Sequence, residues 1–346
     1  MKQQSIFTKV LKEITIMVAL PLCVFALVEI LLYVTKGAHI FNSELDVKNL
    51  IRNAGIVAAL AFALNMNMDA GRMDMSLGAQ RVAGTICGGL LAQTLGLGGV
   101  WVLVFSIAFG LIYGALVGWA FVTLRVPPMV LGLGMSCILE CIGFAVSGGV
   151  GLKLVGSEGI EVLSNVNFTI TVVAIMAVFM LILMTYSTFS YKYRAVSGNQ
   201  TIARNAGINI FTNVVICYTI GGALVCVGGV LSAAFSGSLD ATMGMTSNGV
   251  VLNQLFVMML GGSYLSRYIN QAMGIISASV AMSVFTMGLT AFNVSDAMAS
   301  SIKMILFIIF LTYMANEHLY QQHKADKARI AQAQAIKAER AKANAA

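Results

Sequence analysis

Long apolar stretches separated by short polar segments run along most of the chain. A membrane-spanning helix needs about 20 consecutive, predominantly apolar residues. Ten stretches come near this length, so the pattern predicts an all-α fold, a polytopic transmembrane helical bundle of about ten spans. We place the spans at residues 14–34, 50–67, 76–95, 100–123, 128–146, 168–190, 210–236, 246–260, 270–292 and 298–314.

The composition agrees with a membrane protein. Of the 346 residues, 58% are hydrophobic and 10% are charged, whereas a soluble domain carries roughly 25% charged residues. A water-soluble fold is excluded on this ground. The 34 glycines and 3 prolines also exclude a proline-rich linker protein, and abundant glycine is typical of closely packed transmembrane helices.

The first apolar stretch is interpreted as a retained helix. Residues 1–13 are polar and basic, and residues 14–34 then stay apolar for about a full span. This is longer than the apolar core of a signal peptide, roughly 7–15 residues, and no small-residue cleavage pattern follows before Lys36. We therefore expect an uncleaved first helix.

Basic residues divide the segments between spans into two sets. Lys and Arg concentrate at both ends of the chain and in alternate loops, and the remaining loops with their adjoining span ends hold Lys36, Lys48, Arg52 and Lys153. Because cytoplasmic loops carry the excess of Lys and Arg, both termini are predicted to be cytoplasmic. The same distribution accounts for the net charge of +7 without nucleic acid, which we do not expect as a partner.

Two spans look short and interrupted, near residues 65–76 and 246–263. The first ends in a run too polar for lipid, Asn-Met-Asn-Met-Asp-Ala-Gly-Arg-Met-Asp at residues 65–74, and the second closes on Gly-Gly-Ser at residues 261–263. Non-helical backbone at membrane depth needs protein or water around it, and paired interrupted segments in the two halves of a transporter point to its solute pathway. A helix end followed by a cytoplasmic loop fits the pattern equally well.

Glycines predict close helix packing. Gly110, Gly114 and Gly118 recur at every fourth position of the fourth span, which places them on one face and lets another helix approach closely. Packing within one subunit is favoured over a dimer interface. We expect the same role for Gly261 and Gly262.

The tail differs in composition from the rest of the chain. Residues 316–346 alternate Ala with Lys, Arg, Gln and Glu and have few large apolar side chains. We therefore divide the chain into a transmembrane permease domain, residues 1–315, and a basic cytoplasmic tail, residues 316–346. The tail is predicted to be solvated, with contact to anionic membrane lipid or to a partner as the alternative.

Motifs for catalysis and metal binding are missing from the sequence. No Gly-Lys-Ser or Gly-Lys-Thr of a Walker A motif occurs, so another chain would have to hydrolyse ATP. His39, His318 and His323 fall in loops or the tail, and the six cysteines fall in apolar segments without a Cys-x-x-Cys pair. We therefore predict a transport subunit rather than an enzyme, with no metal site and no cofactor.

Four ionisable residues fall inside spans, where a charge is costly and is a functional candidate by default. They are Glu29, Arg81, Glu140 and Lys303. Glu29 and Lys303 lie near helix ends, and we interpret them as interface anchors. A pair between Glu140 and Arg81 is conceivable, and Glu140 alone gives little support to a proton relay.

Three stretches together resemble one family. Residues 71–78 read Gly-Arg-Met-Asp-Met-Ser-Leu-Gly, residues 197–208 read Ser-Gly-Asn-Gln-Thr-Ile-Ala-Arg-Asn-Ala-Gly-Ile, and residues 257–263 read Val-Met-Met-Leu-Gly-Gly-Ser. In order and spacing they are similar to motifs of the permease subunit of bacterial ABC importers of the ribose, galactose and xylose type, a group related to branched-chain amino-acid permeases. One departure is Arg72, which stands where the family has a second glycine.

The resemblance implies partners and a coupling loop. It implies a separate cytoplasmic ABC ATPase, an extracytoplasmic solute-binding protein, a homodimer with the path at its centre, and a place in the bacterial plasma (inner) membrane. In the family, a short helix in the second motif docks on the ATPase. The corresponding residues here are Gly198, Asn199, Ala203, Arg204 and Gly207. The basic character of this loop agrees, because a short rigid helix on the inner surface can transmit motion to the spans.

We therefore interpret the chain as the permease subunit of an ABC uptake system for a monosaccharide or similar small polar nutrient. The candidate pathway residues are Asn65, Asn67, Asp69, Asp74 and Ser76. Replacing Asn65 or Asp74 with Ala is expected to reduce transport without disturbing assembly. The alternatives are a secondary transporter acting without an ATPase, whose uptake would survive ATP depletion, and a membrane scaffold with no solute flux.

Overall fold

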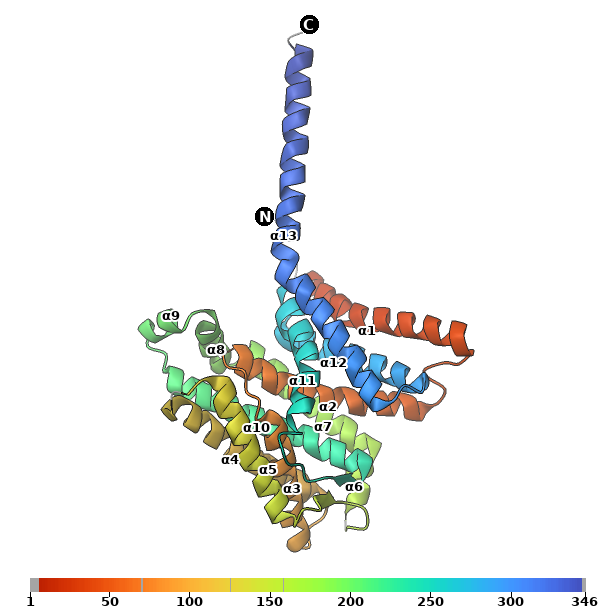
Figure 1. The fold of residues 1–346 in the computed structure, drawn as a ribbon, viewed down its shortest axis with the longest axis vertical. Helices are drawn as coiled ribbons and strands as arrows, with labels where there is room; N and C mark the ends of the chain where they lie inside the picture. Colours follow the sequence, from red (N-terminus) through yellow and green to blue (C-terminus); the bar gives the residue numbers. More distant parts are fainter. Residues whose placement is uncertain (1–5, 70, 125, 158, 344–346) are drawn as a thin grey trace. The chain divides into compact units, whose positions relative to one another are not determined.

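The computed structural model describes residues 6–69, 71–124, 126–157 and 159–343, and they are mostly helical (Figure 1). The chain divides into two units, Met1–Val294 and Ser295–Ala346. The helices of the first unit are α1 (Ile6–Lys36), α2 (Glu44–Asp69), α3 (Leu77–Thr94), α4 (Gly99–Leu124), α5 (Pro128–Val146), α6 (Ile160–Ser164), α7 (Val166–Thr185), α8 (Thr188–Gly198), α9 (Gln200–Asn205), α10 (Ile210–Ser236), α11 (Asn248–Met258), η1 (Met259–Tyr264), η2 (Leu265–Arg267) and α12 (Gln271–Ala291). The second unit is one helix, α13 (Asp296–Ala343).

The predicted helical bundle is confirmed. In the described part of the chain, nine helices are long and apolar enough to cross a membrane, and they coincide with nine of the ten predicted spans. The tenth, α3, is helical but less apolar, since it carries Gln80, Arg81 and Thr85. Gln80 and Thr85 are fully buried, so neighbouring helices rather than lipid surround much of α3.

The sixth predicted span ends earlier than expected. We placed its end at residue 190, whereas α7 stops at Thr185 and a separate helix, α8, begins at Thr188. The Ser187 side chain accepts a hydrogen bond from the backbone N–H of Ser190 at 3.2 Å, which caps the start of α8. This cap turns the chain out of the span and into the loop that we predict to be cytoplasmic.

The two predicted interruptions take different forms. Between α2 and α3 the backbone leaves the helix, with Gly71 at a φ of +78°; Ala70 lies outside the described residues. After α11 the helix does not break at Gly262 but widens into the π-helical turn η1 and continues through η2 to Arg267. A π-helical turn within a helix is rare and is frequently found at functional sites.

Within the first unit, α4 packs against α3 and α10, α5 packs against α3, and α2 packs against α10 and α12. α4 and α10 touch backbone to backbone, because a Cβ on Gly110 would collide with the carbonyl oxygen of Gly222 and one on Gly114 with that of Tyr218. Gly118 lies against the Tyr218 side chain. The Phe121 and Tyr218 rings, stacked 5.7 Å apart, fill the space beside this contact.

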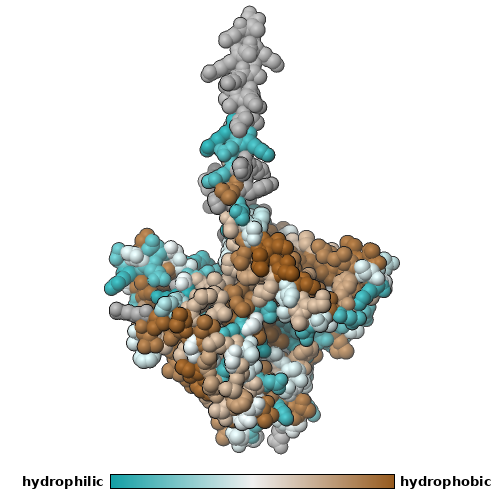
Figure 2. Space-filling view, in the orientation of Figure 1, coloured by the Kyte–Doolittle hydropathy of each residue, from teal (hydrophilic) through white to brown (hydrophobic). Residues whose placement is uncertain are grey.

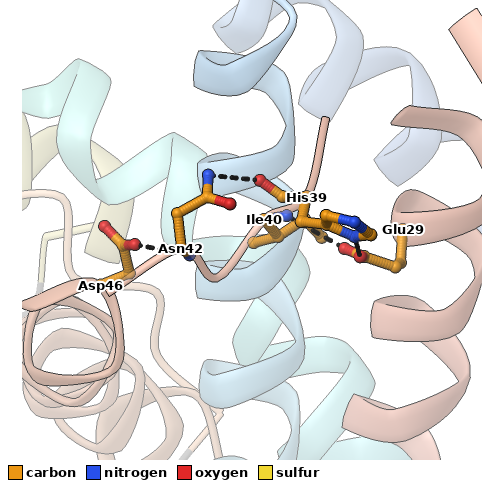
Figure 3. A network of polar contacts seen from close by, with 5 residues as sticks. All are labelled: Glu29, His39, Ile40, Asn42 and Asp46. Atoms are coloured by element: carbon orange, nitrogen blue, oxygen red, sulfur yellow. Dashed lines mark hydrogen bonds and ion pairs between the residues drawn. The ribbon is translucent and has the colours of Figure 1, made fainter. Parts of the chain in front are cut away.

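A short two-stranded sheet and a polar cluster close the loops at one end of the spans. β1 (Leu152–Lys153) pairs antiparallel with β2 (Ser238–Leu239). In the loop between α1 and α2, the Glu29 carboxylate binds His39 Nδ1 at 2.6 Å and accepts the backbone N–H of Ile40 at 3.0 Å (Figure 3). Glu29 therefore holds this loop, and its expected role as an interface anchor stays a prediction.

The surface agrees with a lipid environment. Figure 2 shows hydrophobic residues over much of the visible face of the first unit, while hydrophilic residues gather over α9. Large apolar side chains such as Leu27, Ile30, Ile175 and Trp119 are about half exposed. Their exposure is expected in hydrocarbon, where apolar surface needs no burial against protein.

Replacing Gly114 with Ala is expected to push α4 away from α10 and lower the free energy of unfolding by about 1–3 kcal/mol, the usual effect of overpacking. Gly134→Ala on α5 is the matched control, because no atom lies within 4 Å of its added Cβ. Thermal melting of both variants in detergent, followed by circular dichroism, measures the difference. Equal melting temperatures of the two variants would contradict the prediction, because they would show that the protein's stability does not depend on the close approach of α4 to α10 at Gly114.

Candidate functional site

The non-helical segment between α2 and α3 is organised around a buried carboxylate, Asp74. Its Oδ1 accepts hydrogen bonds from the backbone N–H of Ser76 at 2.8 Å and from Ser76 Oγ at 2.7 Å. Its Oδ2 accepts from Asn67 Nδ2 and Gln80 Nε2, both at 3.2 Å. These four residues, which we name the Asp74 network, are almost completely buried.

Two neighbouring helices lock this segment in place. Ser136 Oγ of α5 lies within hydrogen-bond distance of two acceptors, the Met75 carbonyl oxygen at 3.2 Å and Asn248 Oδ1 of α11 at 2.9 Å. One turn further along α5, the buried Glu140 accepts the backbone N–H groups of Met245 at 2.8 Å and of Ser247 at 3.0 Å. α5 therefore ties the first interruption to the beginning of α11.

The Glu140–Arg81 pair that we considered is not formed. Glu140 satisfies backbone donors just before α11, where a negative charge also interacts favourably with the positive end of the helix dipole. Arg81 instead donates through Nη2 to Ser232 Oγ of α10 at 3.4 Å. Glu140 thus connects α5 to the start of α11, and Arg81 connects α3 to α10.

Arg72, the departure from the family motif, lies against aromatic side chains. Its guanidinium carbon is 4.7 Å from the centre of the Phe121 ring on α4, a cation–π geometry. Phe121 in turn stacks on Tyr218. The bulky cation is therefore accommodated beside the α4–α10 contact.

A second cluster surrounds Asp69 at the end of α2. Asp69 Oδ2 accepts three hydrogen bonds, from the Tyr193 hydroxyl at 2.7 Å, Gln271 Nε2 at 2.6 Å and Asn65 Nδ2 at 3.2 Å. Gln271 also lies 3.3 Å from Asn65 Oδ1 and from the Gly262 carbonyl. We name Asn65, Asp69, Tyr193 and Gln271 the Asp69 network; it joins α2, α8 and α12.

The π-helical turn touches this network through glycine. A Cβ on Gly262 would collide with Asn65 Oδ1, and one on Gly261 would come within 2.7 Å of the Gly274 carbonyl oxygen on α12. Side chains at either position would separate η1 from α2 and α12. The close packing therefore requires glycine at both positions.

The short helix predicted in the loop after the sixth span is present as α9. Asn199 caps it, with Oδ1 accepting the backbone N–H groups of Thr201 at 2.9 Å and of Ile202 at 3.1 Å. Gly207 follows the helix at a φ of +80°, and Gly198 precedes it with open space around it. Arg204 is exposed, whereas Ala203 is 1% exposed and anchors the helix.

A cavity of ≈ 670 Å³ opens beside the Asp69 network. Its walls include Asp69, Tyr193, Gln271 and Gly262 together with Arg194. Across the described residues, no group of three or more His, Cys, Asp or Glu is placed to bind a metal ion.

The five predicted pathway residues are brought together, but in two networks. Asn67, Asp74 and Ser76 belong to the Asp74 network and are enclosed by protein, and Asn65 is buried in the Asp69 network. Asp69 lines the cavity. The sequence analysis did not identify Gln80, Tyr193 or Gln271 as site residues. Gln80 and Gln271 are uncharged polar residues in or beside an apolar span, and this position could have marked them as candidates.

Interrupted helices, buried polar networks at the interruptions and a capped helix in the loop after α8 define a polytopic membrane protein of the transport class. A family model described as "Branched-chain amino acid transport system / permease component" matches residues 47–311. The chain belongs to this family.

Curated relatives agree. The chain is 23% identical over 295 residues to the galactose/methyl galactoside import permease protein MglC of Escherichia coli, covering 78% of this chain and 87% of the relative. It is 23% identical to the probable ABC transporter permease protein YphD of Escherichia coli, covering 83% and 86%. It is also 23% identical to the fructose import permease protein FrcC of Rhizobium meliloti, covering 78% of each.

The family and its relatives confirm the resemblance drawn from the three motifs. The chain is a permease component of an ATP-binding-cassette import system and a multi-pass protein of the bacterial inner membrane. A secondary transporter acting alone is disfavoured.

The geometry changes the expected result of one substitution. In Asp74→Ala, the Ser76 backbone, Asn67 and Gln80 donors lose their acceptor, and each buried donor without a partner costs about 1–3 kcal/mol. We therefore expect a large loss of folded protein instead of undisturbed assembly. The exposed Asp240 provides the control Asp240→Ala. Size-exclusion chromatography of detergent extracts measures the folded yield, and equal yields would contradict a holding role for Asp74.

Proposed function

We propose that this permease works with a separate cytoplasmic ABC ATPase and an extracytoplasmic solute-binding protein to import a monosaccharide or similar small polar nutrient. The observation that carries the proposal is α9, a short capped helix in a basic loop of a chain from the permease family. ATP-driven closure of the ATPase would move this loop and switch the path between outward-open and inward-open states.

The geometry of α9 supports docking on an ATPase. The Asn199 cap and the buried Ala203 keep the helix rigid and attached, while Thr201, Ile202 and Arg204 remain exposed for a partner. A rigid, exposed helix transmits a push better than a flexible loop. Gly198 and Gly207 bound the segment that would move.

The solute class follows from the relatives. Two of them are named for import of galactose or methyl galactoside and of fructose, whereas the family description names branched-chain amino acids. Sequence identity over most of the chain favours the sugars. Asn65, Asn67, Asp69, Asp74 and Ser76 remain our candidates for the pathway, with Asp69 facing the cavity and the other four shaping the interruption beside it.

We further propose that two copies of the chain form the path between them. Within one copy, four of the five candidate pathway side chains are enclosed in helix contacts, so a route between subunits fits better than a route through one. The mass of the purified complex, with a single permease sequence identified, is the measurement. A second, different permease in stoichiometric amount would replace the homodimer with a heterodimer.

Arg204→Glu is expected to weaken co-purification of the ATPase at least several-fold, because it reverses the charge at an exposed position of α9. Arg329→Glu in the tail makes the same charge change outside the loop sequence and should leave co-purification unchanged. Affinity purification in mild detergent, with quantification of the ATPase chain, decides the matter. Purification of the permease without any ATPase would overturn the proposed function.

Uptake measured in proteoliposomes containing the permease, the ATPase and the binding protein is expected to require internal ATP. Radiolabelled galactose, fructose and xylose test the proposed solute class, and leucine serves as the comparison. Uptake of leucine but of no sugar would shift the proposal to amino acids. Sugar uptake that continues without ATP would contradict the coupling mechanism.

A further inference from the structure

Helix α8, which leads directly into α9, is held to the spans by a narrow stripe. Ser190, Tyr193 and Val196 recur at every third position and are its buried residues, whereas Tyr191 on the same helix is 72% exposed. Ser190 and Arg194 bind the carbonyl of Met184, at 2.5 Å and 2.9 Å, and so attach α8 to the end of α7. Tyr193 alone among these residues reaches a polar group of α2.

Tyr193 joins α8 to the interrupted helix. Its hydroxyl is 2.7 Å from Asp69 Oδ2 and 3.2 Å from the Asn65 carbonyl oxygen. Asp69 lies 124 residues earlier in the chain, so this contact links the inner loop to the first interruption. Burial raises the pKa of the Tyr193 hydroxyl well above its ordinary value of 10, and the hydroxyl therefore keeps its proton to donate.

Gln271 carries the link to the second interruption. Its Nε2 donates to Asp69 at 2.6 Å and lies 3.3 Å from the Gly262 carbonyl in the π-helical turn. Gly262 in turn lies directly against the Asn65 side chain. A displacement of Asp69 therefore reaches η1 by two routes, through Gln271 and through Asn65.

The surroundings allow such a displacement. The ≈ 670 Å³ cavity borders Tyr193, Asp69, Gln271 and Gly262 together, so this side of the network faces space rather than packed side chains. Close-packed interiors resist small shifts, and a network beside a cavity can rearrange more readily.

We propose that Tyr193 and Gln271 are positioning residues that couple motion of the α8–α9 segment to the end of α2 and to the π-helical turn. ATP-driven displacement of α9 pulls Tyr193, Tyr193 moves Asp69, and Gln271 passes the shift to η1. The inference rests on the proposed function, and it adds which side chains transmit the motion.

Tyr193→Phe removes the hydroxyl and keeps the ring, which still stacks on Phe189 at 5.9 Å, so the variant should fold. Because the hydroxyl that contacts Asp69 is lost, uptake per ATP hydrolysed is expected to fall about tenfold, which corresponds to about 1.4 kcal/mol of coupling free energy. ATP hydrolysis itself should persist. Tyr191→Phe is the matched control on the same helix and should behave as the wild type.

The experiment measures ATP hydrolysis and galactose uptake in the same proteoliposomes of the full complex. Hydrogen exchange of residues 259–264, with and without ATP and vanadate, provides a readout that needs no solute. In the wild type and in Tyr191→Phe, trapping should change this exchange. In Tyr193→Phe the change should be lost, and in Gln271→Ala it should be reduced, because the route through Asn65 remains.

An unchanged uptake per ATP together with an unchanged exchange response in Tyr193→Phe would overturn the inference. If instead no ATPase binds the wild-type chain, the proposed function fails, and this result is distinct because it appears before any variant is compared. Should Tyr193→Phe fail to fold, Gln271→Ala carries the same test from the other end of the network.

Discussion

The rest of the structure depends on how non-helical backbone is kept inside an apolar bundle. A polar backbone group without a partner is costly where water is absent, and residues 71–76 leave the helix at this place. The Asp74 carboxylate compensates by accepting four hydrogen bonds, including one from the backbone of Ser76. One side chain therefore holds the interruption in place.

Backbone N–H groups also need hydrogen-bond acceptors at the second interruption, and there a side chain from another helix provides them. Glu140 reaches from α5 to accept two backbone N–H groups before α11. The π-helical turn that follows keeps its backbone in helical hydrogen bonds, and its glycines let Asn65 and α12 approach. Ser136 binds both regions, so the two interruptions form one connected structure.

Much of this architecture follows from local sequence. Apolar length predicts ten spans, and nine of them coincide with described helices long and apolar enough to cross a membrane, because this signal acts over neighbouring residues. The short helix α9 was expected from the resemblance of residues 197–208 to a family motif. The polar run at residues 65–74 likewise marks the interruption. Partners far apart in the chain could not be predicted: Tyr193 and Gln271 meet Asp69 across 124 and 202 residues. Only the packing of complete helices sets such distances, which also explains the incorrect Glu140–Arg81 pair.

The polarity of α3 has a consequence for how the protein is made. α3 contains Gln80 and Arg81 and is less apolar than the nine other spans. The free energy of transferring α3 alone into the bilayer is therefore less favourable than that of the other spans. The helices that cover it are α4 and α5, synthesised directly after it, and α10, synthesised more than 100 residues later. Insertion of α3 must therefore proceed together with α4, and its polar face stays uncovered in the membrane until translation has reached the second half of the chain.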